Sequence, residues 1–136
     1  MRNKNINEAA RWIKQAENDL KVAKWSFKGK FYNNTCFMCQ QTGEKALKSF
    51  LYFKGERPVF GHSLLELCRK SRKHDKNFSN IEKECKHLDK YYTITRYPDG
   101  LPGLIPSEYF DKEEAEKAIE YLNKILDIVR SKLSSK

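Results

Sequence analysis

Long apolar runs are missing from this chain of 136 residues. No stretch approaches the roughly 20 consecutive apolar residues of a membrane-spanning helix, and the first residues lack the apolar core of a secretion signal. We therefore expect a cytoplasmic protein with no membrane partner. Glycine-rich phosphate loops and His-Glu-x-x-His pairs are missing as well, so the sequence predicts no cofactor and no metal site.

Glycine and proline are scarce, with six and four residues respectively. Three of the prolines and two of the glycines fall within residues 93–107, which therefore cannot be helical throughout. Elsewhere apolar residues recur every three or four positions, the period of amphipathic helices, and no alternating strand pattern competes. The sequence predicts an all-α fold: one domain of residues 1–136, an up-and-down bundle of about five helices, with a long loop before the last helix.

The helix boundaries follow from stop and start signals. Gly29 and Gly55 should end two long helices, over about 7–28 and 33–54, that form an antiparallel hairpin. Three further starts show a capping residue followed three positions later by glutamate, the pattern of a capping box. These residues, Ser63, Ser79 and Asp111, predict two short helices over about 63–73 and 79–92 and a long one over about 111–133.

Four cysteines raise the question of a zinc site or disulfides. Cys36 and Cys39 form a Cys-x-x-Cys pair, but it lies in a helical apolar stripe without a second pair or a preceding strand. Free cysteine packs as a small hydrophobic residue. We expect Cys36, Cys39, Cys68 and Cys85 to be buried and structural.

The net charge of +9 is concentrated near the start of the chain, where residues 1–54 hold 11 basic and 4 acidic side chains. Several of these cations would lie on neighbouring turns of the first helix, where they could attract phosphates. A solvated lysine face is the alternative. The residues concerned are Arg11, Lys14, Lys21, Lys24 and Lys28.

The segment from Asp89 to Asp99 holds the greatest density of candidate functional groups. Arg96 can make paired bonds to phosphate or carboxylate, and neighbouring tyrosines offer ring faces for a nucleobase. Alternatively, Arg96 pairs with Asp99 and the tyrosines fill the end of the bundle. In the second predicted helix, Gln40, Gln41 and Glu44 either face a site or bond across helices.

Four stretches resemble prokaryotic HEPN (higher eukaryotes and prokaryotes nucleotide-binding) domains. The string from Asp89 to Asp99 looks like their "DKYY…TRYPD" signature, and residues 40–48 are similar to "QQAAEKALK", with Thr42 and Gly43 in place of the paired alanines. Residues 16–20 and 61–67 agree in the same order, so the resemblance extends from about Ala9 to Arg130.

The resemblance implies a dimeric bundle that binds a nucleotide or RNA, commonly as partner of a minimal nucleotidyltransferase in a two-component or toxin–antitoxin pair. The binding residues it implies are Lys90, Tyr91, Tyr92, Arg96, Tyr97 and Asp99, with Gln41, Lys45 and Lys48 from the second helix. A protein-interaction scaffold without a nucleotide site is a further alternative.

Other members of that family are metal-independent ribonucleases that use an arginine followed after four to six residues by a histidine. No histidine occurs from Tyr97 to Gly103, so we expect a binding protein rather than an enzyme. The spacing does occur from Arg57 to His62 and from Arg69 to His74, outside the expected region. If the chain does cleave RNA, Arg96 and His62 are the candidate catalytic residues.

Overall fold

The computed structural model describes residues 2–134, which form helices and turns without a strand. The all-α bundle predicted from the sequence is confirmed. The helices are α1 (Arg2–Lys28), α2 (Tyr32–Phe53), α3 (Leu64–His74), η1 (Lys76–Ile81), α4 (Glu82–Asp89), α5 (Tyr91–Ile94), η2 (Pro98–Gly100), α6 (Pro106–Tyr109) and α7 (Lys112–Ser134). Within this range no helix is both long and apolar enough to cross a bilayer.

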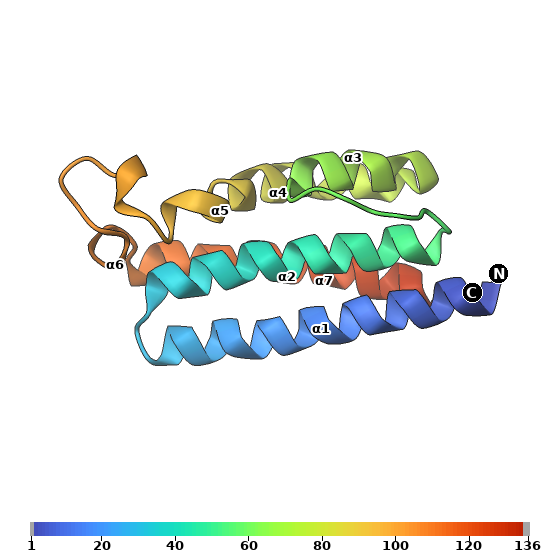
Figure 1. Cartoon of the computed structure of the whole chain (residues 1–136), viewed down its shortest axis with the longest axis horizontal. Helices are drawn as coiled ribbons and strands as arrows, with labels where there is room; N and C mark the ends of the chain where they lie inside the picture. Colours follow the sequence, from blue (N-terminus) through green and yellow to red (C-terminus); the bar gives the residue numbers. More distant parts are fainter. Residues whose placement is uncertain (1, 135–136) are drawn as a thin grey trace.

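Helix α2 is the centre of the bundle and packs most extensively against α1 and α7. The shorter α3 and α4 lie along the other side of α2, while the α1–α2 turn and α6 share the end of the molecule opposite the two termini (Figure 1). Because α2 is covered on several sides, residues such as Cys39, Leu47 and Phe50 are fully buried. Polar groups on α2 must therefore find partners on neighbouring segments.

Two of the three predicted caps form. The side chain of Ser63 accepts a hydrogen bond from the Glu66 amide, and Asp111 accepts one from the Glu114 amide at 2.9 Å. The prediction that Ser79 caps a helix was wrong. The chain already turns at Asp75, which accepts a bond from the Asn77 amide at 2.9 Å and begins η1.

The expected helix over 79–92 is divided into α4 and α5, and the loop that follows it contains two short helical turns, η2 and α6. Both turns begin with proline, whose fixed φ suits the first helical position. Single turns of this kind are too short for hydrophobic periodicity to reveal.

The four cysteines are free and buried, as expected. Burial raises the pKa of the Cys36 thiol to about 12, so it stays protonated at neutral pH. Gly43 is explained by close packing between α2 and α3, since a Cβ atom there would lie 2.7 Å from the Leu64 Cδ2 atom.

Candidate functional site

Arg96 lies just after α5, where its guanidinium group rests on aromatic rings. Its Nε and Nη2 atoms donate to the Tyr92 carbonyl oxygen at 3.0 and 2.5 Å. The guanidinium carbon lies 4.3 Å from the ring centre of Phe37, 5.0 Å from that of Tyr92 and 5.3 Å from that of Tyr97. Among residues 2–134 it forms no ion pair, so the alternative pairing with Asp99 is not found. The result is an exposed planar cation that is held in place by the Tyr92 carbonyl oxygen and by neighbouring rings.

His62 reaches the same tyrosine from a distant part of the chain. Its ring stacks on Tyr92 with 4.7 Å between ring centres and 20° between planes. Its Nδ1 atom lies 3.1 and 3.2 Å from the two carboxylate oxygens of Glu44, while 59% of the side chain is exposed. The ring of Tyr92 therefore contacts both candidate catalytic residues, His62 and Arg96.

Helix α2 fixes His62 through its backbone as well as its ring. The fully buried Gln40 donates from Nε2 to the His62 carbonyl oxygen at 2.9 Å, and Gln41 donates to Gln40 Oε1 at 2.7 Å. Glu44, itself buried, also accepts from Lys48 Nζ at 3.0 Å. The polar residues of α2 thus bond across to the segment before α3 and support the site at the same time.

Asp89 connects the motif to α3. Its carboxylate accepts hydrogen bonds from the amides of Leu64 and Leu65 at 2.6 and 3.1 Å and from the Ser63 hydroxyl at 3.0 Å. A carboxylate at a helix N-terminus accepts hydrogen bonds from amides that have no partner in the helix, and its negative charge interacts favourably with the positive end of the helix dipole. A cavity of about 330 Å³ lies beside it, lined by His62, Ser63, Asp89, Tyr92 and Thr93.

Tyr91 is not available for stacking, contrary to the expectation from sequence. Only 1% of it is exposed, because it points from α5 into the core while Tyr92 points outward. Its hydroxyl donates to Glu114 and lies 2.8 Å from His87 Nε2. Burial raises the pKa of Tyr91 and lowers the pKa of His87. Tyr91 therefore belongs to the link between α4, α5 and α7.

The two lysines implied on α2 already have partners. Lys45 Nζ lies 2.5 Å from Asp19 Oδ2, and the buried Lys48 pairs with Glu44 and lies 5.6 Å from the ring centre of Trp12. Neither is a free cation for a phosphate. Lys90, Tyr97 and Asp99 are exposed, so they remain on the candidate surface with Arg96. Phe37 contacts Arg96, although no motif assigned it to the site, and Glu44, which the sequence offered for either a site or a bond across helices, contacts His62.

Comparison with known proteins gives a consistent result. The family profile described as "HEPN domain" matches residues 9–132. A Methanocaldococcus jannaschii protein named "Putative toxin MJ1304" is 30% identical over 97% of this chain and 92% of its own length. Among solved structures, TT1696 of Thermus thermophilus superposes with a TM-score of 0.88 at 35% identity, covering 93% of this chain and 98% of that one.

Two further solved structures are similar. ST0689, described as an archaeal HEPN homologue, gives a TM-score of 0.77 at 35% identity and covers 93% of this chain and 98% of its own. A HEPN domain protein of Thermotoga maritima gives 0.74 at 28% identity, with 93% and 99% covered. The agreement therefore extends over nearly the whole length of each chain.

Proposed function

Because the chain belongs to the HEPN domain family, we propose that it binds a nucleotide or nucleic acid at a site formed by His62, Tyr92 and Arg96. The observation that carries this proposal is the contact of both His62 and Arg96 with the ring of Tyr92. Phosphate recognition needs a cation that is open to solvent, and base recognition needs an accessible ring. Arg96 supplies the first and Tyr97, 53% exposed, supplies the second.

The biological setting that we propose is a toxin–antitoxin pair in the cytoplasm. The toxin name of the Methanocaldococcus jannaschii relative supports it. The same resemblance that predicts this setting predicts a homodimer and a minimal nucleotidyltransferase as the partner protein. A scaffold without a nucleotide site is disfavoured, because the Arg96 side chain is exposed and forms no ion pair within residues 2–134.

A metal-independent endoribonuclease is the second candidate, and the position of His62 favours it. With Nδ1 facing Glu44, the exposed ring can use Nε2 for proton transfer. His62 would take the proton of an RNA 2′-hydroxyl as that oxygen attacks the adjacent phosphorus. Arg96 would stabilise the added charge on the phosphoryl oxygens, the bond to the 5′-oxygen would break, and water would protonate that oxygen.

Incubation of the purified protein with mixed RNA, with and without chelator, distinguishes the two candidates. Arg96→Ala and His62→Ala are compared with two matched variants on α3, Arg69→Ala and His74→Ala. In the wild type, Arg69 pairs with Glu82 and His74 pairs with Glu56. Binding that is lost in the Arg96 variant, without cleavage, supports the binding protein. Chelator-resistant cleavage that is lost in both site variants but in neither control supports the ribonuclease. RNA that is neither bound nor cut refutes both.

A further inference from the structure

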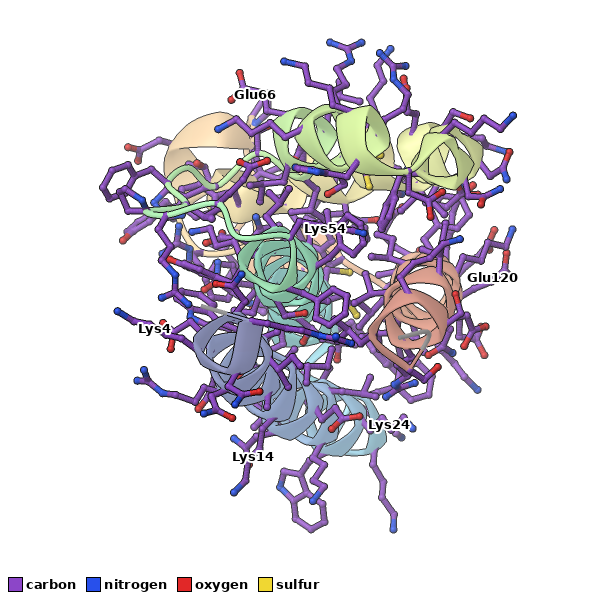
Figure 2. The ribbon with its side chains drawn as sticks, turned by 90° about the vertical axis from the view of Figure 1, so that its right-hand side faces the viewer. Lys4, Lys14, Lys24, Lys54, Glu66 and Glu120 are labelled. Atoms are coloured by element: carbon purple, nitrogen blue, oxygen red, sulfur yellow. The ribbon has the colours of Figure 1, made fainter. Side chains whose placement is uncertain are left out.

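A stretch without acidic residues surrounds the α1–α2 turn. From Leu20 to Gly43 the chain has no aspartate or glutamate but four lysines, Lys21, Lys24, Lys28 and Lys30, all exposed. None of the four forms an ion pair within residues 2–134. Lys24 extends away from the body of the bundle (Figure 2). This end of α1 therefore presents positive charge that the protein does not neutralise.

Two aromatic residues stand among these lysines. Trp25 is 75% exposed and Phe31 is 65% exposed, and a cavity of about 440 Å³ is lined by both together with Ser26, Lys28 and Gly29. Large exposed apolar groups that gather in one patch, as these two do around one cavity, mark interaction sites. The cavity lies within the range of small-molecule sites.

Hydrogen bonds within the turn fix the backbone from which the two side chains project. The Gly29 amide donates to the Trp25 carbonyl oxygen at 3.0 Å and the Phe31 amide to that of Ser26 at 2.8 Å. The Phe31 ring lies directly over Gly29, since a Cβ atom there would be 3.1 Å from the ring. Asn34 also donates to the Ser26 hydroxyl at 2.6 Å. The backbone of the site is thus preorganised, which lowers the entropy lost on binding.

We propose that this turn is a binding site for single-stranded nucleic acid, in which an unpaired base stacks on Trp25 and Phe31 while Lys24, Lys28 and Lys30 contact phosphates. Proteins that bind single strands combine such ring platforms with a basic surface. A second copy of the chain fits less well, because protein interfaces are depleted in lysine at their centres. A duplex fits less well too, because its bases are already stacked and paired.

The inference rests on the proposed function, because the turn is fixed next to the Arg96 segment. Asn33 Nδ2 donates to the Thr95 carbonyl oxygen at 3.1 Å, and Phe37, less than two helical turns further along α2, lies under Arg96. Figure 1 shows the α1–α2 turn and the segment that follows α5 at the same end of the molecule. One short strand can therefore contact both sites.

Fluorescence of Trp25 provides a direct test. The only other tryptophan, Trp12, stacks on Tyr52, so Trp12→Phe leaves Trp25 as the single reporter and keeps a ring in that contact. A ten-nucleotide oligoadenylate is the probe, and a blunt duplex of the same length and the polyanion heparin are the comparisons. We expect oligoadenylate to quench Trp25, and the duplex and heparin to leave its emission almost unchanged.

Affinity for the labelled oligoadenylate, measured by anisotropy, provides the second readout. Trp25→Ala should weaken binding about 5- to 150-fold, the equivalent of about 1–3 kcal/mol for one stacked base, and Trp25→Phe should restore part of it. Lys24→Gln with Lys28→Gln should reduce the salt dependence of binding. The matched control, Lys70→Gln with Lys73→Gln, changes two exposed lysines of α3 and should leave the salt dependence of binding close to that of the wild type.

The outcomes separate this inference from the proposed function. If Arg96→Ala weakens binding and Trp25→Ala does not, the stacking site is refuted and the Arg96 site stands. If Trp25→Ala weakens binding and Arg96→Ala does not, the Arg96 site is refuted and the stacking site stands. A Trp25→Ala variant that binds normally but loses self-association in sedimentation would identify the surface as a contact between copies, and would refute the inference.

Discussion

Removal of the Asp89 carboxylate tests whether this first residue of the Asp89–Asp99 motif stabilises the fold by capping α3. In Asp89→Ala the amides of Leu64 and Leu65 and the Ser63 hydroxyl all lose their acceptor. Loss of a helix cap costs about 0.5–2 kcal/mol, and loss of a favourable charge at a helix N-terminus costs up to about 1 kcal/mol more. We therefore expect the free energy of unfolding to fall by about 1–3 kcal/mol.

Urea unfolding followed by circular dichroism measures this loss. Asp89→Asn keeps an oxygen acceptor but not the charge, so it should cost only about 1 kcal/mol. Asp99→Ala, an exposed carboxylate in the same motif, should change stability by less than about 0.5 kcal/mol. A loss below about 0.5 kcal/mol in Asp89→Ala would refute the capping role. Loss of RNA binding in a fully stable Asp89→Asn variant would instead place the carboxylate against the ligand.

Three further perturbations address packing, pH and recognition. Gly43→Ala should destabilise the protein by about 1–3 kcal/mol in urea unfolding, because its Cβ would overlap the Leu64 side chain. Burial lowers the pKa of His87 in the folded state, so the unfolded state binds its proton first: stability should fall as pH drops below about 6.5, and His87→Gln should flatten that part of the pH profile. Arg96→Lys keeps the charge but loses the planar stacking, so it should weaken oligoadenylate binding about tenfold in an anisotropy titration. Unchanged binding would mean that Arg96 contributes only its charge.

The sequence predicted the long helices because their apolar stripes are long enough to define a period. It predicted the capping roles of Ser63 and Asp111 correctly and that of Ser79 incorrectly. At Ser79 the deciding contact is tertiary: Phe78 is fully buried, and the chain must turn at Asp75 to place it there. Local capping patterns do not contain that information, because they describe only the turn that follows the cap.

The site was predictable only in part, for a similar reason. The sequence proposed Arg96 and Tyr92 because both lie in one local motif, and the structure places them in contact. Adjacent residues of a helix point about 100° apart, so one of Tyr91 and Tyr92 had to face the core, and the sequence does not say which. The approach of His62 to Tyr92 involves a bond from Gln40 on α2 to the His62 carbonyl oxygen in the segment before α3, which no spacing rule describes.

Three residues of the motif contact different parts of the bundle, which affects how mutations in it must be interpreted. Asp89 caps α3, Tyr91 bonds to α7 through Glu114, and Thr95 accepts a bond from α2 through its carbonyl oxygen. Tyr92 contacts both His62 and Arg96 at the candidate site, and it is held between these anchors. A Tyr91→Phe variant that loses RNA binding would therefore report displacement of Tyr92 rather than a lost contact. Only variants of Tyr92 itself, with unfolding measured in parallel, test its contact with a ligand.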